Sequence, residues 1–145
     1  MQLEELQLTK SDEISTDKKQ IYIVDDDESI CRALSLLLDT YGFQVQTFAS
    51  ADQFLNSVLK HAPACLILDV HMAGMDGFAL QQKLKTNGSK LPIIFISADK
   101  TLKFSEQYLK AAGAVGFLQK PFNDQALVNL INIAVEKSST DKTKK

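Results

Sequence analysis

The sequence predicts a doubly wound α/β domain, in which helices cover both faces of a parallel five-stranded sheet. Short apolar runs alternate five times with segments of helical spacing, and this alternation implies βα units with right-handed crossovers. The apolar runs are continuous, which is typical of parallel strands buried on both faces. Ligands of such sheets bind outside the carboxyl ends of the strands. The residues at those ends are therefore the candidates for a site.

Five apolar runs mark the strands, four of them strong and one weaker. In chain order they cover 21–24, 43–47 (the weaker run), 64–68, 93–96 and 115–118. Between them apolar residues recur with helical spacing, clearly in the first two helices and less regularly in the other three. The predicted helices cover 30–41, 51–59, 77–86, 101–112 and 123–136.

Capping signals support these helix boundaries. Ser50 with Gln53 three residues later forms a capping box at the start of the second helix. Gly42, Gly88 and Gly113 stand where helix C-caps are expected, because a C-cap favours a left-handed backbone that glycine adopts without strain. The helices and strands are thus predicted to join through short connections.

Length and charge predict one domain with polar ends. We expect a polar N-terminal tail at 1–19, the domain at 20–136, and a basic C-terminal tail or linker stump at 137–145. No signal peptide or membrane span is predicted, so we expect a cytoplasmic protein. Cys31 and Cys65 are expected to be reduced core thiols.

The overall charge argues against a direct role in binding nucleic acid or membranes. The chain has 16 Lys and Arg against 18 Asp and Glu, for a net charge of −2. Such a balance gives no electrostatic footprint for DNA or for an anionic membrane. Any DNA contact would have to come from outside this chain.

Charged and polar residues follow four of the five predicted strands. They are Asp25, Asp26 and Asp27 after the first strand, Asp69 after the third, Ser97 after the fourth and Lys120 after the fifth. Taken singly, several have a structural explanation; Asp27, for example, suits the N-cap of the first helix. Together, Asp25, Asp26 and Asp69 would carry −3 at one sheet edge, and Lys120 reduces this only to −2. Like charges so close oppose joint ionisation, whereas a divalent cation with oxygen ligands, such as Mg²⁺, would neutralise them.

These segments resemble the receiver domain of two-component response regulators. The matching stretches are Asp25-Asp26-Asp27 after the first strand, 66–77 around Asp69, 92–98 around Ser97, and 113–122 around Lys120. The resemblance covers 20–136 and implies a flavodoxin-like (βα)5 fold with strand order 2-1-3-4-5. The segments around Ser97 and Lys120 look like the subgroup that is often fused to a LuxR-type helix-turn-helix output domain.

The resemblance implies a role for each polar residue. Asp69 would be the phosphoacceptor, receiving phosphoryl from the phosphohistidine of a sensor histidine kinase or a phosphotransfer protein. Mg²⁺ would be bound by Asp26, Asp69 and the backbone carbonyl of His71, with Asp25 acting through water. Such a protein is not an enzyme toward other substrates, because it catalyses only its own phosphorylation and dephosphorylation.

The resemblance also implies a switch. Lys120 would pair with one phosphoryl oxygen, Ser97 would hydrogen-bond another, and Phe117 would turn inward. The face formed by the fourth helix, the fifth strand and the fifth helix would then change, and this face is the expected surface for a homodimer or an output partner.

Three departures and one backbone feature accompany the resemblance. Ala73 stands where the family usually has proline, and Ser97 stands where threonine is common. Phe117 occupies the aromatic switch position, at which the family also commonly has tyrosine. The Lys120-Pro121 bond is a candidate cis peptide. In addition, His71 and Asp99 flank the site, where their side chains would tune the lifetime of the acyl phosphate.

The sequence argues against two other functions and leaves a third open. A phosphatase of the haloacid-dehalogenase type needs a second acid two residues after its nucleophile, but that position holds His71. A flavodoxin needs a phosphate-binding loop after the first strand, where this chain has only acidic residues. A receiver-like module that acts unphosphorylated as an interaction platform stays open as the alternative.

Overall fold

The computed structural model describes residues 19–57, 63–103 and 106–143. Five parallel strands form one sheet in the order β2-β1-β3-β4-β5, which confirms the predicted fold class. The strands are β1 (Gln20–Val24), β2 (Gln44–Phe48), β3 (Cys65–Asp69), β4 (Ile93–Ser97) and β5 (Ala114–Gln119).

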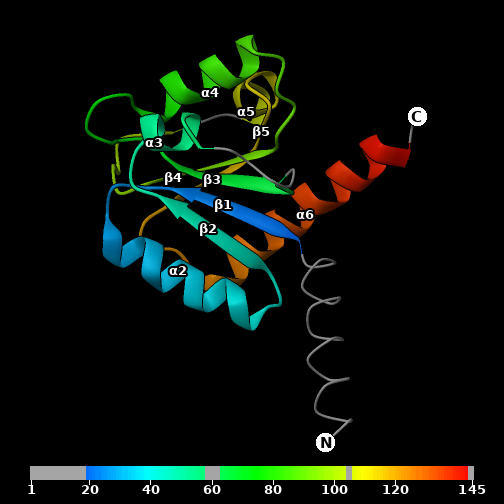
Figure 1. Ribbon diagram of the computed structural model, residues 1–145, viewed down its shortest axis with the longest axis horizontal. Helices are drawn as coiled ribbons and strands as arrows, with labels where there is room; N and C mark the ends of the chain where they lie inside the picture. The colour runs from blue at the N-terminus through cyan, green and yellow to red at the C-terminus, as the bar shows by residue number, and fades with distance from the viewer. Residues whose placement is uncertain (1–18, 58–62, 104–105, 144–145) are drawn as a thin grey trace, which may run out of the picture.

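Helices cover both faces of the sheet, with α2 and α6 on one face and α3, α4 and α5 on the other (Figure 1). The helices are α2 (Glu28–Thr40), α3 (Ala51–Leu55), α4 (Gly77–Thr86), α5 (Glu106–Ala111) and α6 (Asp124–Thr143). The central strands β3 and β4 are buried along their whole length. Continuous burial explains why their sequences are apolar throughout rather than alternating.

Two hydrophobic clusters hold the layers together. Ile21 and Ile23 of β1 belong to the cluster under α2 and α6, whereas Tyr22 and Val24 belong to the cluster under α3, α4 and α5. Successive side chains of a strand point to opposite faces, so one strand contributes to both cores. Leu127 of α6 is fully buried, and burying a side chain of this size stabilises the fold by roughly 1.5–3 kcal/mol.

The predicted caps are present. Asp27 caps α2, accepting hydrogen bonds from the backbone N–H groups of Ser29 and Ile30. Ser50 caps α3 by accepting from the N–H of Gln53 at 3.0 Å, and the side chain of Gln53 reaches back to the N–H of Ala49 at 2.6 Å. Gly42, Gly88 and Gly113 all have positive φ, as their C-cap positions require.

Three helix boundaries differ from the prediction by four residues or more. α3 ends at Leu55 with Asn56 as its C-cap, so the expected end at 59 is wrong, although 58 and 59 themselves lie outside the described residues. The expected start of the fourth helix at 101 is also wrong, because Thr101 donates its N–H and its hydroxyl to Asp99, forming a turn instead. α6 continues to Thr143, beyond the expected end at 136.

The sequence of α6 explains its extra length. No glycine or proline interrupts 137–143, so this segment lacks the residues that most strongly disfavour a helix. The residues expected to be a C-terminal tail therefore continue the helix as far as Thr143.

Cys31 and Cys65 are free and buried, as predicted. Burial is the main cause that raises the pKa of Cys31 to about 11 and that of Cys65 to about 12. Both thiols are therefore protonated at neutral pH. Within the described residues, no helix combines the length and the apolar character that crossing a membrane would require.

Candidate functional site

The structure brings three carboxylates together at the carboxyl edge of the sheet. Asp25 directly follows β1, Asp26 is the next residue, and Asp69 is the last residue of β3. Each offers one carboxylate oxygen, and these three oxygens all lie within 4.8 Å of one another. Asp25 and Asp69 are buried, whereas Asp26 is exposed. β1 and β3 are neighbours in the sheet, so residues 44 positions apart become adjacent.

Backbone groups hold the two carboxylates that follow β1. The N–H of Asp27 donates to Oδ1 of Asp25 at 2.9 Å. The N–H of Ala73 donates to Oδ2 of Asp26 at 3.2 Å, which joins the loop after β3 to the loop after β1. Proline, which the family usually has at position 73, could not make this second bond because it has no N–H. The departure at Ala73 therefore adds a contact to the site.

Gly77 allows α4 to start close to the end of β3. A Cβ atom at this position would collide with the backbone carbonyl of Asp69. The N–H of Gly77 donates to the carbonyl of Val70 at 2.8 Å. Since any larger residue would push the two segments apart, glycine is required here for the position of Asp69.

Lys120 brings the only ammonium group that the described residues place in this cluster. Its Nζ lies 2.8 Å from Oδ2 of Asp25 and 3.8 Å from Oδ1 of Asp69. Its backbone N–H donates to the carbonyl of Ser97 at 2.7 Å, which fixes the end of β5 against the end of β4. The Lys120-Pro121 peptide bond is cis, as predicted.

The pKa of Asp69 is raised to about 7. Burial is the largest cause, the negative charge of Asp25 is the next, and Lys120 opposes both. An ionised Asp69 is therefore unfavourable beside its neighbours without a further positive charge. A set of carboxylate oxygens with this charge imbalance fits a hard divalent cation such as Mg²⁺.

Ser97 and Phe117 occupy the next two strands of the sheet. Ser97 is the fully buried last residue of β4, and its hydroxyl oxygen accepts from the N–H of Asp99 at 3.0 Å. Its hydroxyl hydrogen stays available as a donor. Phe117 lies on β5, is half-buried, and packs against the cluster under α3, α4 and α5.

His71 and Asp99 form a hydrogen-bonded pair that the sequence did not reveal. Nε2 of His71 lies 2.9 Å from Oδ2 of Asp99, so the pair joins the loops after β3 and β4. Hydrogen bonds from Thr101 are the largest cause of the lowered pKa of Asp99, and the bond with His71 adds to them. Both residues stand two positions beyond neighbouring strand ends, and this equal offset is the signal that could have indicated their pairing.

Comparisons with known proteins agree with the fold and identify the family. The profile of the response regulator receiver domain matches residues 21–132. Response regulator protein TodT of Pseudomonas putida is 44% identical over 116 residues, which is 80% of this chain and 51% of TodT. Transcriptional regulatory protein TdiR of Thauera aromatica is 39% identical over 130 residues, which is 90% of this chain and 55% of TdiR.

Solved structures show the same similarity. The crystal structure of full-length FixJ from B. japonicum aligns with a TM-score of 0.76 and 33% sequence identity, covering 87% of this chain and 62% of that chain. This chain spans about half the length of the curated relatives it matches. The matched residues include the carboxylate cluster and Lys120, and we conclude that this chain belongs to the receiver-domain family of two-component response regulators.

Proposed function

We propose that this domain is a phosphorylation switch whose phosphoacceptor is Asp69. The observation that carries the proposal is the buried Asp69, which lies within 4.8 Å of two further carboxylates and 3.8 Å from the ammonium of Lys120. This arrangement combines a nucleophilic oxygen with groups that would bind a cation and phosphoryl oxygens. Phosphoryl transfer needs little else from a protein, because positioning and charge neutralisation supply most of the catalysis.

The reaction is transfer of a phosphoryl group from a phosphohistidine of a sensor kinase or phosphotransfer protein. A carboxylate oxygen of Asp69 attacks the phosphorus, the P–N bond to the histidine breaks, and the imidazole leaves with the electron pair. The product is an acyl phosphate on Asp69, which water later hydrolyses to inorganic phosphate. The protein thus catalyses only its own phosphorylation and dephosphorylation.

Four residues would hold the cation required for this transfer. Asp26, Asp69 and the backbone carbonyl of His71 would be direct ligands, and Asp25 would act through water. When bound, Mg²⁺ would offset the negative charge that the carboxylates and the incoming phosphoryl oxygens bring together. Asp25 is already hydrogen-bonded to Lys120 and to the N–H of Asp27, which supports its indirect role.

Two further residues would respond to the phosphoryl group. Lys120 lies between Asp25 and Asp69, so a small movement of its ammonium would bring it to a phosphoryl oxygen. Ser97 would turn its hydroxyl hydrogen toward another oxygen, and Phe117 would move inward from its half-buried position. The surface of α5, β5 and α6 would change with them.

That surface is the proposed contact for a second copy or an output partner. Complete switching from 1:99 to 99:1 requires phosphorylation to favour the active form by about 5.5 kcal/mol. TdiR, one of the relatives, is named as a transcriptional regulatory protein. We therefore infer that this domain takes part in regulating transcription. The resemblance of the segments around Ser97 and Lys120 to the LuxR-type subgroup supports an output of the helix-turn-helix type, and the net charge of −2 supports the proposal that this chain does not itself contact DNA.

Phosphorylation with a small phosphodonor tests the assignment of Asp69. In acetyl phosphate and Mg²⁺, the native protein should gain one acid-labile phosphoryl group, detected as an intact-mass increase or a Phos-tag mobility shift. Asp69→Asn should abolish this gain. The matched control is Asp27→Asn, because Asp27 is an exposed helix cap outside the cluster and asparagine also caps helices well.

Two outcomes would contradict the proposal. One is labelling of Asp69→Asn to the same extent as the native protein, which would place the phosphoacceptor elsewhere. The other is the absence of any chemical-shift change on α5, β5 and α6 when beryllofluoride and Mg²⁺ are added. That second result would favour the alternative, an interaction module that works without phosphorylation.

A further inference from the structure

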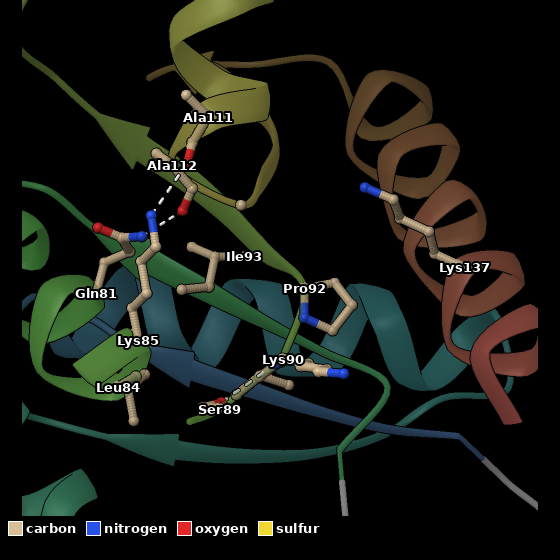
Figure 2. A pocket seen from close by; sticks show the side chains of 12 residues that line it. Gln81, Leu84, Lys85, Ser89, Lys90, Pro92, Ile93, Ala111, Ala112 and Lys137 are labelled. Carbon is tan, nitrogen blue, oxygen red and sulfur yellow. Dashed lines mark hydrogen bonds between the residues drawn. The ribbon is translucent and has the colours of Figure 1, made fainter. Parts of the chain in front are cut away.

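A surface hollow lies at the edge of the sheet opposite to the carboxylate cluster. Its volume is about 340 Å³, near the lower end of the roughly 300–1,000 Å³ typical of small-molecule pockets. Residues of α4, the loop before β4, the end of α5 and α6 surround it (Figure 2). The hollow is therefore at the amino end of β4, where the proposed phosphorylation chemistry has no part.

The walls of this hollow combine an apolar surface with positive charge. Four apolar side chains form part of the lining: Leu84, Leu91, Pro92 and Ile93. Three lysines from three different elements stand around them: Lys85 of α4, Lys90 of the following loop and Lys137 of α6. None of the described lining residues is acidic. The hollow thus carries a formal charge of +3 in a chain whose net charge is −2.

The ammonium groups of these lysines have N–H donors that could still bind a ligand. No salt bridge within the described parts of the chain involves Lys85, Lys90 or Lys137. Lys85 gives one of its three N–H groups to the carbonyl of Ala111 at 3.2 Å. Figure 2 shows Lys137 reaching in from α6 on the side opposite to Lys85. All three lysines are exposed, and each would attract the negative end of a ligand that lies in the hollow.

Two hydrogen bonds give the hollow a defined wall. The buried side chain of Gln81 donates to the carbonyl of Ala112, next to the bond between Lys85 and Ala111 (Figure 2). These bonds fix the end of α5 against α4. Ser89 accepts from the N–H of Leu91 at 3.2 Å, so its hydroxyl hydrogen is available for a ligand.

We propose that this hollow binds a compact organic anion, with an apolar body against Leu84, Leu91, Pro92 and Ile93 and a carboxylate or phosphate head among Lys85, Lys90 and Lys137. The apolar surface gives the affinity for the body, and the lysines select the negative head. The hollow shares no residue with the carboxylate cluster. The proposal can therefore be tested independently of the phosphorylation of Asp69.

Titration followed by ¹H–¹⁵N NMR tests the proposal with three probes. Pentanoate has both an anionic head and an apolar body, 1-pentanol lacks the charge, and acetate lacks the body. Pentanoate should shift the amides of 81–93 and 111–113 in a saturable manner. Its Kd should be about tenfold lower than those of the other two probes, since each removes one of the two recognised features.

Charge-matched variants separate a site from general attraction to positive charge. The triple variant Lys85→Gln, Lys90→Gln, Lys137→Gln should bind pentanoate about tenfold more weakly. The control Lys83→Gln, Lys100→Gln, Lys103→Gln removes the same charge outside the hollow and should bind as the native protein does. If the triple variant is unstable, Lys90→Gln with Lys137→Gln keeps the Lys85 bond to Ala111 and should weaken binding about threefold.

Either of two results would overturn the proposal. One is pentanoate binding that both triple variants weaken equally, because only the net charge would then matter. The other is the absence of saturable shifts in 81–93 and 111–113 with any of the three probes.

Discussion

At the residue scale, Ala73 changes how the carboxylate of Asp26 is held. Its N–H donates to Oδ2 of Asp26, the carboxylate proposed as a ligand of Mg²⁺. Such a hydrogen bond draws negative charge away from the carboxylate and makes it a weaker ligand, and hydrogen bonds to charged groups contribute roughly 1.5–3 kcal/mol. A residue that differs from the family pattern therefore acts directly on a proposed metal ligand.

Replacing Ala73 by proline should strengthen Mg²⁺ binding. Proline removes the N–H, which frees the oxygen of Asp26, and we expect an Mg²⁺ affinity about threefold to tenfold higher. Tryptophan is absent from this chain, so the affinity is best measured by NMR or calorimetry. Ala73→Ser keeps the N–H and is the control. Weaker binding by Ala73→Pro would show that the hydrogen bond instead positions Asp26 for the cation.

The pair of His71 and Asp99 spans the loops beside Asp69, where it would hinder water from reaching an acyl phosphate. The pair is partly exposed, so solvent screens the interaction and its effect is small. Asp99→Ala should therefore shorten the lifetime of the acyl phosphate by up to about fivefold. The loss of phosphoprotein after removal of acetyl phosphate, followed by Phos-tag gels, measures this lifetime.

Asp76→Asn is a suitable control for that experiment, because Asp76 is an exposed N-cap of α4 and asparagine replaces it in this role. An Asp99→Ala protein whose acyl phosphate persists as long as the native one would mean that the pair of His71 and Asp99 does not shield the site.

At the element scale, the close approach of α4 to β3 depends on Gly77. A methyl group there would collide with the backbone carbonyl of Asp69. We expect Gly77→Ala to lower the free energy of unfolding by about 1–3 kcal/mol, the usual cost of overpacking. Because the displaced residue is Asp69, the rate of phosphorylation by acetyl phosphate should also fall. Urea denaturation and intact-mass kinetics give the two quantities.

Gly88→Ala is the matched control. Gly88 has a φ of +85° but faces open space, so its replacement costs about 1 kcal/mol through backbone strain alone. It lies at the other end of α4, and phosphorylation should continue at the native rate. If both variants phosphorylate equally fast, the contact between Gly77 and Asp69 does not matter for the site.

Among the properties of the helices and strands, the helix boundaries were the hardest to predict from the sequence. The periodic first helix and the third helix lie close to their predicted positions, α2 at Glu28–Thr40 and α4 at Gly77–Thr86. The start of α5 could not be predicted, because it depends on the turn that Asp99 makes with Thr101. Such side-chain bonds compete locally with helix formation, and apolar spacing does not report them.

At the scale of the whole molecule, the carboxylate cluster lowers stability when no cation is present. The pKa of Asp69 is about 7 in the folded protein, against about 3.9 for an unfolded aspartate. The folded state therefore holds this proton more tightly. The stability that this proton confers is complete below about pH 4 and is lost as the pH rises through about 7.

In EDTA, the native protein should consequently lose stability relative to Asp69→Asn as the pH rises. Between pH 5 and pH 8, we expect the difference in free energy of unfolding to shift by on the order of 2 kcal/mol in favour of the variant. Urea denaturation at the two pH values measures it. Asp52→Asn, which changes an exposed carboxylate on α3, should follow the native protein.

Saturating Mg²⁺ should reverse the effect at pH 8. A ligand at 100 times its Kd stabilises the folded state by about 2.7 kcal/mol, and Asp69→Asn should lose most of this gain. If the native protein and Asp69→Asn respond equally to pH in EDTA, the ionisation of Asp69 is not opposed by its surroundings.

Local signals along the chain are enough to predict the order of the strands and helices, the two faces of the sheet, and the strand ends at which the polar residues stand. Apolar runs and turn residues are local signals, and a parallel sheet brings its strand ends to one edge. From these signals it was possible to predict that Asp25, Asp26, Asp69 and Lys120 meet.

Which atoms meet depends on how the loops and helices pack in three dimensions. The hydrogen bond from Ala73 to Asp26, the pair of His71 with Asp99, and the three lysines around the hollow at the amino end of β4 all join residues from different elements. Such contacts depend on distances between loops and helices that pack around the sheet. Periodicity along the chain carries no information about those distances, because it reports only which side of each element is buried.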